Sequence, residues 1–238
     1  MSKARVTLFP NGVSNADPNT FEDLAHLRIG DPTKFHTFFD DFDRYNVTTG
    51  EDWTITATGA GVDDVADGDA GLLVLTNAAA DNDSLWIQNR VESFLWESDK
   101  ELWFKCRVNV DDATLADVLV GLWIATATDP VDTPPTDAIF FRKLAAATDI
   151  DFVLTKDSTS TAATAIGTMV DGVDIELAFH YDGGGTFTVY IDDSLVLTQT
   201  DISNVPDDEV LTVGFGVQNG SAVSRVATYD YVLAVKER

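Results

Sequence analysis

Two acidic pairs are the first positions at which this chain could do chemistry. They are Asp149-Ile150-Asp151 and Asp174-Ile175-Glu176. Residues two apart in an extended strand share a face, so the two carboxyl groups of each pair would start from Cα atoms about 6.5–7 Å apart. Some glycosidases use two carboxyl groups in this way, one as acid and one as nucleophile or base. Alternation with apolar residues equally produces a solvated acidic face, and we favour that interpretation in a chain with 40 acidic residues.

No catalytic motif supports an enzyme. Glucanases of the laminarinase type carry Glu-x-Asp-x-x-Glu, and no segment here matches it. A Gly-x-Ser-x-Gly elbow is absent, and Gly183-Gly184-Gly185 lacks the Lys-Ser/Thr ending of a phosphate-binding loop. The one cysteine, Cys106, alternates in phase with Phe104 and Val108, which predicts a buried apolar residue. We therefore expect a protein that is not an enzyme.

Acidic loops are the candidates for metal binding. Residues 63–69 (Asp-Asp-Val-Ala-Asp-Gly-Asp) and Asp81-Asn82-Asp83 have the oxygen density that calcium prefers. The first departs from EF-hand spacing, and such loops are usually turns. His26, His36 and His180 lie far apart and show no metal-ligand spacing. We expect no cofactor, with calcium at either loop as the alternative.

Two tryptophans mark a strand face opposite the predicted core. Trp86 shares its phase with Arg90, and Trp103 shares its phase with Lys105 and Arg107. Such a face suits a protein interface or stacking against a sugar. A third interpretation is that a loop or the N-terminal arm covers it. All three stay open, and Trp86, Arg90, Trp103 and Arg107 are our interface candidates.

Short strands must position these residues, because the apolar period is two from Phe38 onward. We expect strands at 53–56, 71–76, 84–90, 100–110, 117–126, 138–144, 149–156, 163–170, 174–181, 186–191, 195–198, 210–218 and 225–235. Residues 63–71 read as an acidic turn, and the loop at 129–135 is too proline-rich to pair. The pattern predicts an all-β fold, an antiparallel β-sandwich or jelly roll.

An extended arm, residues 1–37, precedes the β-sandwich domain, residues 38–238. Val6 to Phe9 could form a short edge strand, and Phe21, Leu24 and Leu27 have the spacing of a short helix. Such a helix is not stable in isolation, so it docks either on its own body or on a neighbouring subunit. Both alternatives stay open. Phe9, Phe21, Leu24 and Leu27 are the arm's interface candidates.

The charge restricts the partners. With 40 acidic against 15 basic residues the formal net charge is −25, which repels nucleic acid and anionic membranes. No apolar run approaches the roughly eighteen residues of a membrane span, and the N-terminus lacks the apolar core of a signal peptide. We expect no nucleic-acid and no membrane partner, and synthesis in the cytosol.

Residues 38–238 resemble the concanavalin A-like (laminin G-like) jelly roll. The matching features are Phe39-Asp40-Asp41-Phe42, the hairpin at 189–196, and residues 211–217 followed by Asp230-Tyr231-Val232. Residues 31–43 followed by such a body resemble virion structural proteins of tailed bacteriophages, particularly aquatic ones. That resemblance implies a non-enzymatic capsid decoration (cement) protein. Such proteins commonly form trimers and use terminal arms to clamp the shell.

The functional expectations follow from this resemblance. We expect a structural virion protein on the capsid exterior, assembled in the host cytoplasm. Its partners would be the major capsid protein or another virion protein, and it would be a homo-oligomer, with a trimer favoured. The alternative is a carbohydrate-binding, lectin-like module of a phage tail or fibre that uses Trp86 or Trp103. A glycosidase of the β-glucanase type ranks below both.

Overall fold

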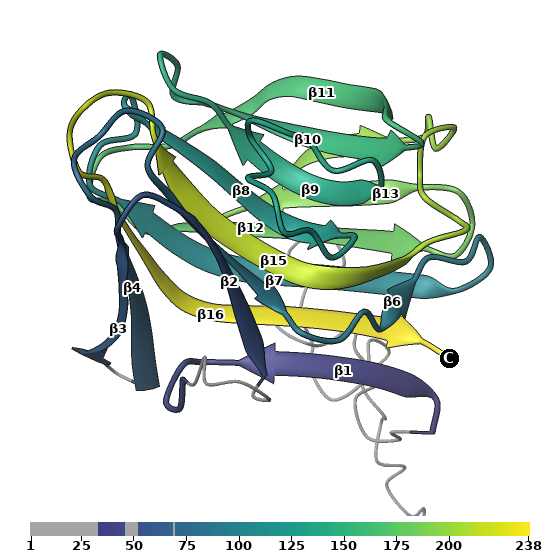
Figure 1. Cartoon of the computed structure of the whole chain (residues 1–238). Coiled ribbons are helices and arrows are strands. Elements are labelled where there is room, and N and C mark those ends of the chain that lie inside the picture. Colours follow the sequence, from purple (N-terminus) through teal and green to yellow (C-terminus); the bar gives the residue numbers. More distant parts are fainter. Residues whose placement is uncertain (1–32, 46–51, 69) are drawn as a thin grey trace, which may run out of the picture.

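In the part of the chain that the structure describes, two antiparallel sheets of eight strands each face one another (Figure 1). The structure is a computed structural model of the 238-residue chain, and it describes residues 33–45, 52–68 and 70–238. These residues contain sixteen strands and no helix. The predicted all-β antiparallel sandwich is thus confirmed. The predicted arm helix and the candidates Phe9, Phe21, Leu24 and Leu27 lie outside the described residues.

The first sheet, called sheet A, has the strand order β14-β13-β12-β7-β16-β4-β3, and β1 also pairs with β16. Its strands are β1 (Phe35–Asp40), β3 (Val62–Gly68), β4 (Ala70–Thr76), β7 (Glu101–Val110), β12 (Ile175–Asp182), β13 (Phe187–Ile191), β14 (Ser194–Gln199) and β16 (Val226–Glu237).

The second sheet, called sheet B, has the order β11-β10-β9-β8-β15-β5-β2, and β6 also pairs with β15. Its strands are β2 (Trp53–Thr58), β5 (Ser84–Asn89), β6 (Phe94–Leu95), β8 (Ala116–Trp123), β9 (Ala138–Lys143), β10 (Asp149–Lys156), β11 (Thr159–Thr168) and β15 (Val210–Asn219).

The core lies between the sheets and is filled by alternate residues of each strand. On β7 the inward residues include Phe104, Cys106 and Val108, and Phe104 stacks on Phe179 of β12. Cys106 is fully buried, as predicted, and burial raises the pKa of its thiol. The thiol is therefore a small apolar core group rather than a nucleophile.

A turn at Asp40 to Asp43 fixes the start of the sandwich. Oδ1 of Asp40 accepts a hydrogen bond from the Phe42 amide (2.8 Å), and Oδ2 accepts one from Nε1 of Trp53 (2.9 Å). The backbone of Phe42 is left-handed (φ 56°), which turns its side chain into the core, where it is completely buried. The Gly71 amide donates to the carbonyl of Asp41 at 3.1 Å and joins the turn to β4. The motif that suggested the fold is thus an anchor for the first strand.

Several element bounds differ from the predictions, among them β8, which ends at Trp123, β11, which begins at Thr159, and the unpredicted β6; the two differences that matter most are in sheet A. β1 begins at Phe35, three residues before the start of the predicted body at 38. Val62–Gly68, predicted to be a turn, is β3, which pairs along its length with β4. Most of its residues are exposed at the edge of sheet A, where aspartates remain in water on both faces. Period-two apolarity cannot detect a strand of this kind, since neither of its faces is apolar.

Candidate functional site

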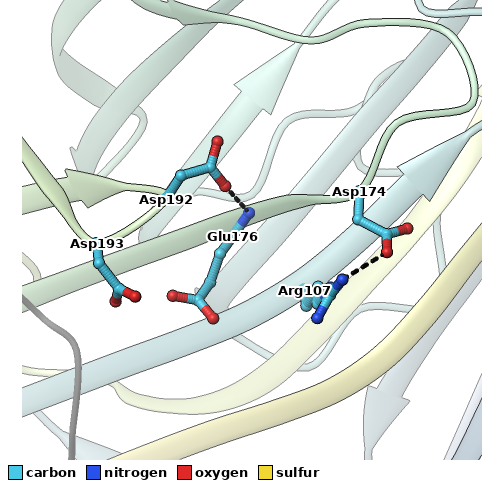
Figure 2. A pocket seen from close by; sticks show the side chains of 5 residues that line it. All are labelled: Arg107, Asp174, Glu176, Asp192 and Asp193. Atoms are coloured by element: carbon cyan, nitrogen blue, oxygen red, sulfur yellow. Dashed lines mark hydrogen bonds and ion pairs between the residues drawn. The ribbon is translucent and has the colours of Figure 1, made fainter. Parts of the chain in front are cut away.

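The outer face of sheet A, turned away from the core, carries a group of charged side chains around a shallow hollow. The hollow has a volume of about 190 Å³ and is lined by Arg107, Asp174, Glu176, Asp192 and Asp193 (Figure 2). We call these five residues, together with Lys105 and Tyr231, the polar patch. It contains Arg107, one of the four candidates predicted from the body, and one of the two predicted acidic pairs.

Strand alternation and one turn bring the polar patch together. On β12, Ile175 and Leu177 point into the core, so Glu176 points outward beside its register partner Arg107 on β7. The β13–β14 hairpin turns at Asp192 and Asp193, both with left-handed backbone (φ 48° and 60°). Asp192 Oδ1 accepts a hydrogen bond from the Glu176 amide at 2.9 Å, which fixes this turn against β12 (Figure 2).

Each carboxyl group of the predicted pair is bound by neighbouring side chains. Glu176 Oε1 lies 2.5 Å from Nζ of Lys105, and its Oε2 accepts a hydrogen bond from the Tyr231 hydroxyl. Asp174 Oδ2 lies 2.7 Å from Nη2 of Arg107, and its Oδ1 accepts a hydrogen bond from Nδ2 of Asn109 (3.0 Å). The patch is thus a network of ion pairs and hydrogen bonds that joins β7, β12 and β16.

The two carboxyl groups have opposite pKa shifts. Burial raises the pKa of Glu176, although Lys105 and Tyr231 oppose the shift. The hydrogen bond from Asn109, followed by the interaction with Arg107, lowers the pKa of Asp174. A glycosidase needs such a difference between its acid and its nucleophile. Here Lys105 and Tyr231 contact the carboxyl oxygens of Glu176, and Arg107 and Asn109 contact those of Asp174.

The second acidic pair is also engaged in structure. Asp151 Oδ2 lies 2.9 Å from Nη2 of Arg142, and its Oδ1 accepts a hydrogen bond from the Ala165 amide at 3.1 Å. Asp149 is exposed at the start of β10. This placement agrees with the solvated-face interpretation.

Trp103 lies on the outer face of sheet A but is buried, with 1% of its surface exposed. It belongs to an apolar cluster, which we define as Phe35, Trp103, Ala178, Tyr190, Leu233 and Val235. Its indole stacks on the ring of His180, with centroids 5.0 Å apart. His180 is partly buried, and its Nε2 lies 3.1 Å from Oε2 of Glu101. Trp103 is therefore not an open platform for a sugar.

Trp86 is covered by the chain's own loop, the third of the interpretations left open above. On the outer face of sheet B its Nε1 donates to Asp129 Oδ2 at 2.8 Å, within the loop that joins β8 to β9. It packs there in a buried group with Trp123 and Phe140. Gly216 makes room for it, since a Cβ at this position would lie 2.6 Å from Cε3 of Trp86. Arg90 remains exposed at the end of β5.

Phe39 is a site residue that we did not predict. It is 57% exposed, and its ring centroid lies 6.5 Å from that of Tyr231 in the polar patch. The alternation of side chains along a strand could have revealed it. Phe38 packs edge-on against Trp53 on the inner side, so the next residue, Phe39, must point outward.

The described residues of the two candidate calcium loops lie in a strand and in a turn. Asp63, Asp64 and Asp67 lie along β3, and Oδ2 of Asp83 accepts a hydrogen bond from the Ala80 amide (2.9 Å) within its own turn. Among residues 33–45, 52–68 and 70–238, no three His, Cys, Asp or Glu side chains are grouped to hold a metal ion. Over the same residues no helix is long and apolar enough to cross a membrane.

Comparisons with known proteins identify the fold. No protein-family model matches the sequence, and no curated protein matches it. Among solved structures, a protein of unknown function from Shewanella oneidensis MR-1 (SO2946) is 12% identical, with a TM-score of 0.60 over 86% of this chain and 87% of the other. An endo-1,3-β-glucanase from Streptomyces sioyaensis is 12% identical, with a TM-score of 0.59 over 87% and 98%. Peanut lectin is 11% identical, with a TM-score of 0.58 over 86% and 98%. The fold is a lectin-like jelly roll. At these identities the similarity concerns fold alone.

Proposed function

We propose that this protein is a structural, non-enzymatic component of a virus particle, a head decoration protein of a tailed bacteriophage. One observation carries the proposal: the carboxyl groups of Asp174 and Glu176 are held in ion pairs within sheet A. The burial of Trp86 and Trp103 removes the predicted sugar platforms as well. Among the described residues, the predicted acid pair at Asp174 and Glu176 and the two predicted indoles thus have structural partners, which supports a function through surface contacts, in keeping with the virion resemblance of residues 31–43.

The surface charge suits the proposed position outside the shell. A net charge of −25 keeps the body away from packaged nucleic acid and keeps free copies apart in solution. Attachment to the major capsid protein or another virion protein would use the N-terminal arm and contacts between copies, with a trimer as the expected unit. Each apolar arm residue buried in such a contact would add about 1.5–3 kcal/mol, multiplied over the copies on a particle.

Co-sedimentation with capsid shells that lack the protein tests this function. The full chain should bind to saturation, and a Phe21→Ser, Leu24→Ser variant should bind more weakly. Val91→Ser, at a position 62% exposed on the loop after β5, is the matched control and should bind as the unmodified chain does. A monomeric protein that stays in the supernatant at every shell concentration would disprove the proposal.

A specific observation keeps glycan binding as a second candidate. The exposed ring of Phe39 and the neighbouring Tyr231 adjoin a hollow lined by Arg107 and by carboxylates, and aromatic rings beside polar groups suit a sugar. Two neighbours in fold, a lectin and a glucanase, are proteins of carbohydrate recognition or cleavage by name. Titration with oligosaccharides would support this candidate only if Phe39→Ala abolished binding. Hydrolysis of a β-glucan that is lost in Glu176→Gln would instead support an enzyme.

A further inference from the structure

One end of the sandwich carries exposed apolar side chains on loops that follow different strands. Leu144 follows β9, Val170 and Val173 lie between β11 and β12, and Val223 lies between β15 and β16. Their exposed fractions are 37%, 55%, 52% and 49% in that order. Single exposed valines are common on protein surfaces, whereas a group of exposed apolar side chains is typical of a contact surface. We call these four residues the apolar end.

Hydrogen bonds hold these loops side by side. They meet around a fourth loop, residues 111–115, which joins β7 to β8. The amides of Ala146 and Gly220 donate to carbonyl oxygens of this loop at 2.8 Å each. From within the loop, the Ala113 amide donates to Oδ1 of Asp171 at 2.7 Å. Because each neighbouring loop is bonded to residues 111–115, the apolar end is one connected surface.

The loop at 144–147 is unlike a turn adapted to water. It reads Leu-Ala-Ala-Ala and contains none of the glycine, proline, asparagine, aspartate or serine that exposed turns usually contain. Ala146 is exposed and has a left-handed backbone (φ 66°), which is unfavourable for alanine. Strained backbone of this kind is found mainly at functional sites. The loop thus presents apolar groups to the outside at a cost in stability, which favours a binding role.

Carboxylates surround the apolar end. The four loops, taken as residues 111–115, 144–149, 169–174 and 220–225, contain five aspartates and one basic residue, Arg225. Arg225 is buried, and its Nη1 lies 3.0 Å from Oδ2 of Asp112 and 3.5 Å from Oδ2 of Asp111. Asp149 and Asp171 are exposed beside Val170. The surface is therefore apolar in the middle and acidic around it.

We propose that the apolar end binds a protein other than a second copy of this chain, through a surface that is apolar at its centre and basic at its rim. Protein interfaces commonly combine an apolar centre with a polar rim, and complementary charge selects the partner. A second copy would bring the same aspartates against these, and like charges facing one another oppose association. The inference rests on the proposed function, in which the contacted protein is the capsid shell.

Co-sedimentation with capsid shells that lack the protein tests the inference. Val170→Ser combined with Val173→Ser should bind the shells about 100-fold more weakly, roughly a factor of ten for each valine that the contact buries. Val91→Ser combined with Val210→Ser is the matched control. These two valines are 62% and 36% exposed at the opposite end of the sandwich, and their loss should leave binding unchanged. All four side chains are exposed, so thermal unfolding should be the same in both double variants.

A charge reversal tests the basic rim of the partner. Asp149→Lys should weaken binding to the shells about tenfold, because it places a cation against the partner's cations. Glu209→Lys reverses an exposed charge just before β15, at the opposite end, and should leave binding unchanged. Unchanged or tighter binding by Asp149→Lys would refute a basic partner surface.

The remaining outcomes separate this inference from the proposed function. Shells that bind the unmodified chain and the Val170, Val173 double variant equally well would refute the inference and leave the proposed function standing. Equal losses in the two double variants would also refute it. An unmodified chain that does not bind shells would refute both. Light scattering of the free protein covers the second copy: an oligomer that dissociates only in the Val170, Val173 variant would assign the apolar end to contacts between copies and overturn the inference.

Discussion

Replacing Lys143 with methionine should change how stability depends on pH. Lys143 lies at the end of β9 with 1% of its surface exposed, and its Nζ donates a hydrogen bond to the carbonyl of Ala116. Around it are apolar side chains that include Val118, Phe141 and Met169. Burial lowers the pKa of the ammonium to about 8, although Asp117 and other acids nearby favour the charged form.

The magnitude follows from the two pKa values of this lysine. In the unfolded chain its pKa is about 10.4, so between about pH 8 and pH 10 the unfolded state holds a proton that the folded state has released. The free energy of unfolding contributed by Lys143 therefore rises with pH in this window. Between pH 7 and pH 10 the free energy of unfolding of the wild type should rise by about 2.5 kcal/mol relative to that of Lys143→Met.

Urea unfolding followed by tryptophan fluorescence at several pH values measures this difference. Subtracting the variant cancels the other groups that titrate in the same window. Lys156→Met is the control, because the ammonium of Lys156 pairs with Asp207 at the surface, and the pair raises its pKa. The difference in free energy of unfolding between Lys156→Met and the wild type should stay nearly constant from pH 7 to pH 10. A flat difference for Lys143→Met as well would refute the conclusion that burial displaces its proton.

Three further changes test the packing. The buried Cys106 thiol keeps a proton that the unfolded chain releases, so Cys106 should lower the free energy of unfolding by about 2 kcal/mol between pH 8 and pH 10. Cys106→Ala should abolish this decrease, and urea titrations at both pH values measure it. Gly71→Ala should cost about 1–3 kcal/mol in a urea titration at pH 7, because the new Cβ would lie 2.2 Å from the carbonyl oxygen of Phe42; an unchanged midpoint would contradict the tight turn. Asp129→Ala should shift tryptophan emission to the red, because the loop over Trp86 loses its acceptor; an unshifted spectrum would show that other contacts hold the loop.

The fold could be predicted because the inward residues dominate the pattern. Strands with one apolar face, such as Glu101–Val110 and Val210–Asn219, were found within a residue or two of their bounds. Strand β3 was missed, since both of its faces lie largely in water and its aspartates resemble a turn. Residue patterns report burial against a core, and an edge strand without such burial has no pattern of this kind.

The site was predicted in part. Alternation correctly placed Trp86 and Trp103 on outer faces but could not show what lies over them, because the loop containing Asp129 approaches from a distant part of the sequence. The acidic pair at Asp174 and Glu176 was visible in the sequence. Its partners Lys105, Arg107 and Tyr231 are brought to it only by the pairing of β12, β7 and β16, which a single sequence does not specify.

Mass spectrometry of purified particles of a phage that encodes this chain tests the central proposal most directly. Quantified against the major capsid protein, the chain should be present in intact particles at a fixed ratio of many copies per head. Stripping it from the heads should leave their DNA in place, as expected for an exterior protein. Particles that contain none of this chain, or a protein found only in the soluble lysate, would contradict the structural role.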